Sequence, residues 1–350
     1  MRSRFNSVHF SAIATALPSE TLELESLGPV FGEEYVRRVI ASTGVEQVHV
    51  APRGTTASDL CFLAAKSMME KESLLPQDFD ALVFVSQSPD YVTPSTSPSL
   101  QARLGLSTDT ACMDLNFGCS GFVYGLLQAC MLCSLDSCRR VMLLVGDVQT
   151  PFVNQRDKSL RMVIGDGASA TLVEKGDKVA FGAHFSDGTG VEHLYIPAGG
   201  RRKPYTAESG VDVLGDDGNY RSDLNLHMNG SEILKFAMGT VPGLIENLLA
   251  DANWPKEQVD LFVLHQANKL ILESIRRKLK VPTEKVPVKL RSTGNTSPTT
   301  IPMALSKMRE DGEDLNRLDR VVLCGFGIGL SYGAIATSLQ GCHIHSPIYV

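Results

Sequence analysis

The sequence lacks the features that mark several specialised classes of protein. No apolar run is long enough to span a membrane, and the first residues lack the apolar stretch of a signal peptide. The 33 basic and 39 acidic residues nearly balance, so the net charge of −6 gives no reason to expect a nucleic acid or an anionic membrane as a partner. Eight cysteines in so long a chain, without a secretion signal, indicate reduced thiols rather than a disulfide framework. We therefore expect a cytoplasmic protein.

The composition that remains is typical of a globular enzyme. Hydrophobic residues make up 43% of the chain and charged residues 21%, and 350 residues allow a large core and two domains. Residues 80–86, 140–147 and 261–264 form short runs that are apolar on both faces, as parallel strands covered by helices are. Helical patterns separate these runs. The sequence therefore predicts an α/β fold.

The second half of the chain repeats the order of the first. The run that begins at Asp80 returns at Asp260, and the run that begins at Arg140 returns at Arg320. A repeat this long indicates two similar α/β halves from a duplicated unit rather than a solenoid. We predict one half over residues 1–176 and another over residues 177–350. A polar, glycine-rich excursion at 199–221 interrupts the second half, and we expect it to be a surface loop.

Cys119 follows an apolar strand-like run and directly precedes a helical pattern with Phe122 and Leu126 on one face. A thiol at this corner meets the positive end of the helix dipole and free backbone N–H groups, which both favour the thiolate. Gly118 and Gly121 leave room for an approaching substrate. The arrangement is similar to the nucleophile elbow of acyl-transferring enzymes. A buried structural cysteine explains this stretch equally well.

Two further polar stretches stand at the ends of apolar runs. His265 follows the strand predicted over 261–264, and Asn295 lies in a polar turn at 292–298 before a predicted helix. Taken alone, a hydrogen-bonded structural histidine and a helix cap explain both. If the two halves are pseudo-symmetric, these turns could converge on Cys119. A thiol and two neutral donors suit acyl transfer through a thioester, followed by stabilisation of an enolate oxygen.

Seven short motifs in register carry a resemblance to a known family. They lie at residues 119–122, 165–168, 196–200, 229–237, 265–268, 294–297 and 325–331. The chain resembles the thiolase superfamily, and within it the β-ketoacyl-acyl carrier protein synthase III enzymes. The resemblance implies a thiolase-like α/β fold, with two duplicated, pseudo-symmetric halves in a five-layered αβαβα arrangement.

The resemblance also implies a mechanism. Cys119 takes an acyl group from a primer thioester, and backbone N–H groups of Cys119 and Ile328 form the oxyanion hole. His265 and Asn295 donate hydrogen bonds to the malonyl thioester carbonyl, which eases decarboxylation. The carbanion then attacks the acyl-Cys119 carbonyl and releases a β-ketoacyl product. No metal and no redox cofactor is required, because the substrates are thioesters of coenzyme A or acyl carrier protein.

The same resemblance implies the partners. Malonyl-acyl carrier protein is the expected extender, and Lys269, Arg276 and Arg277 on a basic helix would dock the carrier protein. Arg38 and Ser42 occupy positions where the family has an aromatic residue and an arginine that hold the coenzyme A nucleotide, so the carrier of the primer stays open. The loop at 88–98 resembles a segment of the family's dimer interface, and we expect a homodimer. An ordinary surface loop fits these residues equally well.

Other interpretations remain beside this one. Cys119 could pass its acyl group to a small acceptor without decarboxylation, or the chain could be a non-catalytic subunit of a heteromeric enzyme. Cys130, Cys133 and Cys138 have spacing that suggests zinc, but no histidine is near and packing explains them better. His343 and His345 alternate as on a strand, and two ligands alone make a metal site improbable. The last ten residues suggest no role.

Overall fold

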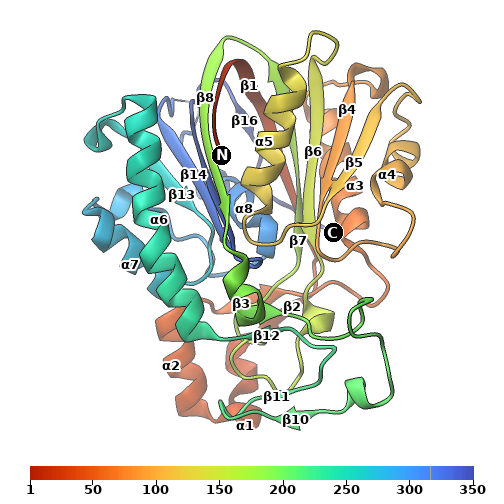
Figure 1. The fold of residues 1–350 in the computed structure, drawn as a ribbon, viewed down its shortest axis with the longest axis vertical. Helices are drawn as coiled ribbons and strands as arrows, with labels where there is room; N and C mark the ends of the chain where they lie inside the picture. The colour runs from red at the N-terminus through yellow and green to blue at the C-terminus, as the bar shows by residue number, and fades with distance from the viewer. Residues whose placement is uncertain (316) are drawn as a thin grey trace.

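The computed structural model describes residues 1–315 and 317–350. Nine strands form one continuous path, β13-β14-β15-β8-β1-β7-β6-β4-β5, across the molecule (Figure 1). Their bounds are β1 (Arg2–Leu17), β4 (Ala81–Val85), β5 (Ala111–Leu115), β6 (Arg140–Asp147), β7 (Gly167–Lys175), β8 (Lys178–Ser186), β13 (Leu261–Leu264), β14 (Val321–Gly327) and β15 (Ser331–Thr337). Shorter strands are β2 (Thr21–Glu23), β3 (Gln47–His49), β9 (Leu194–Tyr195), β10 (Val213–Leu214), β11 (Tyr220–Arg221), β12 (His227–Met228), β16 (His343–Ile344) and β17 (Ile348–Tyr349).

The strands on the two sides of β1 repeat one pattern of directions. β4 and β6 are parallel, as are β13 and β14, while the next pairs along, β6 with β7 and β14 with β15, are antiparallel. β7 then runs antiparallel to β1, and β15 antiparallel to β8. β1 joins the two sets because its first part pairs with β8 and its second part with β7. Residue 176, where we predicted the boundary, lies in the turn between β7 and β8.

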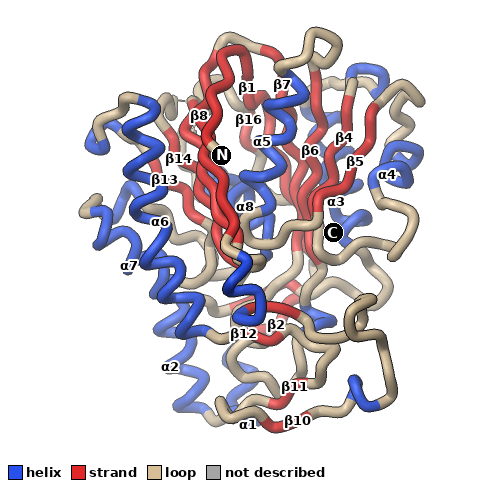
Figure 2. Tube along the Cα trace, viewed as in Figure 1, coloured by secondary structure: helices blue, strands red, loops and turns tan. Residues whose placement is uncertain are grey.

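The helices occupy three layers around these strands (Figure 2). α5 and α8 lie in the middle, where α5 contacts both β4 and β6 of one set and β14 and β15 of the other. α3 and α4 cover the outer face of the first set, and α6 and α7 the outer face of the second. The result is the αβαβα order expected from the sequence. The helices are α1 (Gly28–Phe31), α2 (Glu33–Thr43), α3 (Ala57–Lys71), α4 (Ser97–Arg103), α5 (Gly121–Cys133), α6 (Gly230–Ala252), α7 (Lys269–Leu279) and α8 (Thr300–Glu310).

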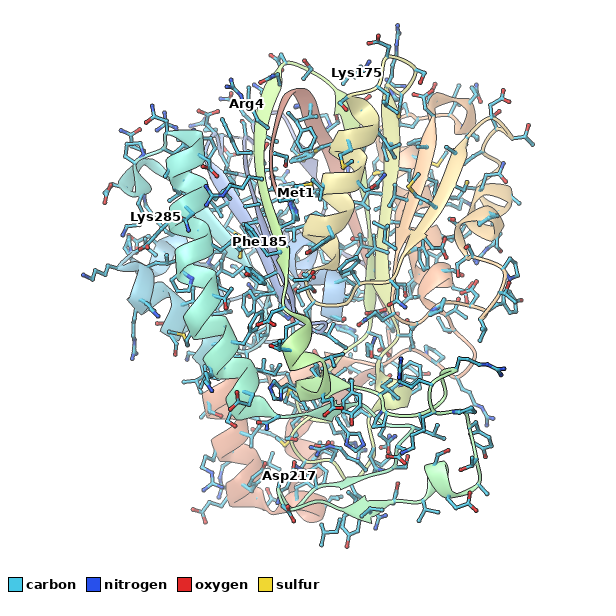
Figure 3. The ribbon with its side chains drawn as sticks, in the orientation of Figure 1. Met1, Arg4, Lys175, Phe185, Asp217 and Lys285 are labelled. Carbon is cyan, nitrogen blue, oxygen red and sulfur yellow. The ribbon has the colours of Figure 1, made fainter. Side chains whose placement is uncertain are left out.

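The excursion at 199–221 lies at the surface, as predicted. Most of its residues are exposed, and its regular structure consists of the short strands β10 and β11 and one 3-10 turn at Glu208–Gly210. Its end is tied down because Arg221 forms ion pairs with buried Asp157, at 2.5 Å, and with Asp217, at 2.9 Å. Asp217 lies at the lower end of the molecule (Figure 3).

The last residues, for which the sequence suggested no role, add two short strands along the free edge of β1. β16 and β17 both run parallel to β1. His343 and His345 point to one carboxylate, with their ring nitrogens 2.7 and 2.6 Å from the two oxygens of Glu72. This pairing fixes the segment to the end of α3.

One described helix, α6, is long and apolar enough to cross a membrane by length and composition. Its apolar residues, among them Val241, Ile245 and Leu248, are buried, and the helix packs against β8, β14, β15 and α7. Such burial is typical of the core helix of a globular protein, so we assign α6 to the core.

The middle layer is the apolar centre of the molecule, and α5 supplies much of it. Leu126 is 1% exposed and belongs to the cluster that joins α5 to strands of both sets. We expect Leu126→Ala to lower the free energy of unfolding by about 2–5 kcal/mol, because it leaves a cavity between two sheets. Denaturant unfolding measures this change.

Leu135→Ala is the matched control for Leu126→Ala. Leu135 is 52% exposed just beyond the same helix, so its truncation should change stability by less than about 0.5 kcal/mol. Equal effects of the two substitutions would contradict a central position for α5.

Candidate active site

Cys119 lies in the turn between β5 and α5, and the end of β14 passes directly against it. A Cβ atom built on Gly327 would stand 2.5 Å from the Cβ of Cys119, and one built on Gly325 would stand 2.9 Å from the Cα of Ser120. Only glycine allows so close an approach of two backbones. The Ser120 hydroxyl adds a hydrogen bond of 2.6 Å to the Ser331 hydroxyl. These contacts bind the Cys119 turn of one half to β14 and β15 of the other.

The thiol of Cys119 is neutral in the unliganded protein. Burial raises the pKa of the Cys119 thiol to about 11, and the negative charge of Asp147 adds to the rise. Hydrogen bonds from the backbone N–H groups of Ile328 and Cys119 oppose it. From the sequence we expected the helix terminus and these N–H groups to favour the thiolate. That expectation left out burial, which has the larger effect on the pKa. The same two N–H groups do face the sulfur, where the oxyanion hole was predicted.

Asn295 is held by its backbone on both sides. Its N–H donates to the Val163 carbonyl at 2.7 Å, and its own carbonyl accepts from the N–H of Gly165 at 3.1 Å. The side-chain oxygen accepts a hydrogen bond of 2.9 Å from the N–H of Ser297. This fixes the orientation of the amide, since only its oxygen can accept from a backbone N–H. The NH₂ group is left as a donor, and Asn295 lines a cavity together with Cys119.

His265 follows β13 and is almost fully buried, at 2% exposure. Its ring packs edge-on against Phe326, the residue between the two glycines that contact the Cys119 turn, with ring centres 5.5 Å apart. Nδ1 lies 2.6 Å from the hydroxyl of Thr300, in the first turn of α8. Burial lowers the pKa of His265 to about 3, so the imidazole is neutral at physiological pH. The sequence did not indicate a role for Thr300, because threonine is common at the start of a helix.

Asp147 is a second residue that the sequence reasoning missed. It ends β6 without any exposure, and its carboxylate accepts hydrogen bonds from the Ser297 hydroxyl at 2.7 Å, the N–H of Gln87 at 2.7 Å and the Ser86 hydroxyl at 2.9 Å. Burial raises the pKa of Asp147, and these donors oppose the rise. Asp147 thus holds the turn that orients Asn295. Its place at the carboxyl end of a strand, like that of Cys119, was the available signal.

Cys119 and Asn295 line a cavity of about 50 Å³. Apolar side chains form most of its wall, and Gln87 and Gln149 add polar groups. The lining consists of Gln87, Cys119, Gln149, Leu160, Ile164, Leu194, Leu226, Met228, Asn295, Ser297 and Ile328. The structure thus brings the predicted nucleophile, one predicted donor and the predicted oxyanion residue Ile328 to one chamber. His265 is not among the lining residues. Its ring packs on Phe326, and the Thr300 hydroxyl lies within hydrogen-bond distance both of that ring and of the carbonyl of Ser297, which does line the chamber.

Arg38 and Ser42 lie on α2. Neither is an aromatic residue that could stack on a nucleotide. The Arg38 guanidinium lies 5.5 Å from the ring centre of Tyr35, one helical turn earlier, and the ammonium of Lys158 lies 5.3 Å from the same ring. Ser42 bonds only within the helix, to the Val39 carbonyl at 3.0 Å. Tyr35 therefore places an aromatic ring between two cations near the predicted nucleotide position.

The three basic residues predicted to dock a carrier protein differ in their surroundings. Lys269 and Arg277 are exposed on α7. Arg276 is half-buried, pairs with Glu273 at 2.9 Å and donates to the Val281 carbonyl at 2.9 Å. Its guanidinium is thus engaged within the helix and its cap. Docking by Lys269 and Arg277 stays a prediction, and Arg276 is the least available of the three.

The remaining candidates have structural surroundings. Cys130, Cys133 and Cys138 pack in the apolar cluster of the middle layer, as expected. Within residues 1–315 and 317–350, no three histidine, cysteine or acidic side chains gather as metal ligands. Asp166 begins the tight turn into β7, and its carboxylate accepts hydrogen bonds from the N–H groups of Gln149 and Ala51 at 2.7 and 2.8 Å.

The raised pKa of Cys119 predicts how its alkylation depends on pH. The thiolate is the reactive form, so the rate with iodoacetamide should rise about tenfold per pH unit between pH 7 and pH 9, well below the pKa of about 11. Mass spectrometry of the peptide that contains Cys119 measures the rate. The peptide of Cys112, a half-buried thiol, provides an internal comparison. A rate that levels off below pH 8 would contradict a Cys119 thiol of raised pKa.

Comparison with known proteins agrees with this geometry. Residues 113–188 match the family model described as 3-oxoacyl-[acyl-carrier-protein] synthase III, and residues 249–339 match the model of its C-terminal part. The chain is 33% identical over 334 residues to the β-ketoacyl-[acyl-carrier-protein] synthase III of Syntrophomonas wolfei, covering 94% of this chain and 96% of the relative. One such enzyme of Streptomyces coelicolor is also 33% identical, with 93% and 95% covered.

Solved structures give the same result. A 3-oxoacyl-(acyl-carrier-protein) synthase III superposes with a TM-score of 0.91 at 35% identity, over 95% of this chain and 99% of that one. The 3-oxoacyl-(acyl-carrier protein) synthase of Burkholderia xenovorans superposes with a TM-score of 0.92 at 31% identity, over 100% and 99%. The predicted thiolase-like fold is thereby confirmed. Because the identities exceed 30% over nearly the whole length, the chain belongs to the β-ketoacyl-acyl carrier protein synthase III family of condensing enzymes.

Proposed function

We propose that this protein joins an acyl thioester primer to a malonyl thioester by decarboxylative condensation, through an acyl-Cys119 intermediate. The observation that carries the proposal is the shared chamber, in which Cys119 and Asn295 line one small space. The neutral ring of His265 packs against Phe326, whose neighbour Gly327 contacts Cys119. The product is a β-ketoacyl thioester for fatty acid or polyketide biosynthesis.

In the first step the sulfur of Cys119 attacks the carbonyl carbon of the primer. The carbon–sulfur bond to the carrier breaks, the acyl group stays on Cys119, and the carrier leaves as a thiol with the proton that Cys119 has lost. The N–H groups of Cys119 and Ile328 stabilise the oxyanion of the tetrahedral intermediate. Such donors act strongly in a buried site, because no water competes for the charge.

In the second step the malonyl thioester carbonyl accepts hydrogen bonds from Asn295 and His265. Nε2 of His265 carries a proton when the Thr300 hydroxyl donates to Nδ1, 2.6 Å away. Loss of carbon dioxide then leaves an enolate whose charge rests on an oxygen with two neutral donors. A neutral imidazole fits this role, because a charged one would be costly at 2% exposure. The carbanion attacks the acyl carbonyl and releases the Cys119 sulfur.

Malonyl-acyl carrier protein is the proposed extender, and the primer is carried by coenzyme A or by a carrier protein. Lys269 and Arg277 on α7 supply positive charge for an acidic carrier. The reaction as written needs no metal and no redox cofactor.

We further propose a cytoplasmic homodimer. Tyr91 and Val92 of the 88–98 loop support the dimer, because they are apolar and 64% and 104% exposed.

Asn295→Ala and His265→Ala should separate the two chemical steps. Each variant should still take up an acyl group on Cys119, because the oxyanion donors are backbone groups, but decarboxylation should slow by about 10²–10³. Mass spectrometry measures the acylation, and release of labelled carbon dioxide from malonyl-acyl carrier protein measures the second step. Cys119→Ala is the control that cannot be acylated.

Normal condensation by either donor variant would refute the assigned roles. Acylation of the wild-type protein without any release of carbon dioxide would instead favour simple acyl transfer, and absence of acylation would favour an inert subunit.

Charge reversal on α7 tests carrier-protein docking. We expect Lys269→Glu with Arg277→Glu to raise the KM for malonyl-acyl carrier protein about tenfold and to leave kcat unchanged. Exposed ion pairs contribute about 0.2–1 kcal/mol each, and two lost attractions become two repulsions. Arg139→Glu is the matched control, because Arg139 is exposed at the opposite end of the sheet, before β6. An equal KM in the double variant and the control would exclude docking at α7.

A further inference from the structure

Two glutamines line the chamber of Cys119, and the proposed reaction uses neither of them. Gln87 follows β4 and Gln149 follows β6, and these strands are parallel neighbours, so both residues lie at one edge of the sheet. The backbone N–H of Gln87 donates to Asp147 at 2.7 Å. That of Gln149 donates to Asp166, also at 2.7 Å. Both glutamines are therefore held in place by their backbones.

The side-chain amide of Gln87 lies against the turn that carries the nucleophile. A Cβ atom built on Gly118, the residue before Cys119, would stand 2.3 Å from Oε1 of Gln87. This amide makes no hydrogen bond within residues 1–315 and 317–350, so both its oxygen and its NH₂ group are open to a ligand. Polar groups in the interior of a protein are normally hydrogen-bonded, so a free amide at this position indicates a role in binding.

Gln149 has the complementary group. It is 7% exposed, and its side-chain amide acts as one of the donors that oppose the raised pKa of the Asp147 carboxyl. An amide that donates through its NH₂ group keeps its oxygen as an acceptor. The two glutamines together therefore have a free donor, on Gln87, and a free acceptor, on Gln149.

The chemistry of the chamber selects among the substituents that an acyl group can carry. The residues that line it have no charged side chain, so an ionised substituent would lose its hydration without gaining a counter-charge. A carboxylate would in addition meet the negative charge of Asp147 near Cys119. An alkyl group would leave both amides without partners. A hydroxyl group is neutral, and it donates one hydrogen bond and accepts another, so it matches the two free groups.

We propose that this enzyme prefers hydroxyacyl thioesters as primers, and that the hydroxyl group accepts a hydrogen bond from the NH₂ group of Gln87 and donates one to the oxygen of Gln149. A chamber of about 50 Å³ holds about four groups of the size of a water molecule, at about 10–15 Å³ each, so a hydroxyl close to the thioester carbonyl is within reach of both amides. This inference rests on the proposed function, since it concerns the acyl group that Cys119 receives.

The test uses pairs of N-acetylcysteamine thioesters whose acyl groups differ only by a hydroxyl in place of a methyl group. One pair is hydroxyacetyl and propionyl, and the other is 3-hydroxypropionyl and butyryl. In each case the acyl–sulfur bond to N-acetylcysteamine breaks, a new one forms to Cys119, and N-acetylcysteamine leaves as the thiol with the proton of Cys119. The mass gain on Cys119 of the full-length protein gives the loading rate, and division by the rate with free cysteine corrects for the reactivity of each thioester.

We expect the wild type to load the hydroxyl member of at least one pair about tenfold faster than the alkyl member on this corrected scale. The reason is that only the hydroxyl member forms hydrogen bonds to the two amides, and such bonds are worth about one power of ten in rate.

Gln87→Leu and Gln149→Leu replace the two amides by apolar side chains of similar size. Each variant should load the hydroxyl member about tenfold more slowly than the wild type and should lose the preference for it. Two variants keep the test valid if one of them does not fold. Gln77→Leu is the matched control, because Gln77 is exposed between α3 and β4, and it should keep the preference of the wild type.

A wild type that loads both members of each pair equally, or prefers the alkyl member of both, would overturn the inference. So would an unchanged preference in Gln87→Leu and Gln149→Leu. Loading of no thioester at all would instead overturn the proposed function.

Discussion

The site depends on one close approach, that of β14 to the turn that carries Cys119. Gly325 and Gly327 let the backbone of one half lie against the nucleophile of the other, where any side chain would collide with Cys119 or Ser120. Phe326 between them supports the ring of His265, and Ile328 just beyond them turns its N–H toward the sulfur. The predicted nucleophile, the histidine and the predicted oxyanion donor are thus positioned by a single strand end.

Burial determines the charge states at this site. It favours a protonated thiol at Cys119, whereas an activated cysteine is usually described as a thiolate. The thiol of Cys119 and the imidazole of His265 are both neutral, because a charge on either would be poorly solvated. Neutral groups suit condensation, in which the enolate charge must be met by hydrogen bonds rather than by a fixed cation. Asp147 is a buried carboxylate near Cys119, and it is surrounded by donors and holds the Asn295 turn in place.

The sequence by itself determined the elements and the identity of the three polar residues at their ends. Apolar runs such as 81–85 and 261–264 are local signals, and the repeat of their order predicted two matching halves. Cys119, His265 and Asn295 were found because each directly follows or precedes such an element. Asp147 follows the same rule and was overlooked, while Thr300 carries no local signal at all.

Only the tertiary structure decided the charge states, the partners and the room around Cys119. The pKa of the thiol depends on how much water reaches it, and burial comes from strands more than 150 residues away rather than from the helix that follows it. Tyr35 could be placed between Arg38 and Lys158 only once α2 and the 157–159 segment had been brought together. Likewise, Cys119 and Asn295 are far apart in the sequence, and they line one cavity only because the folded chain brings their two turns together.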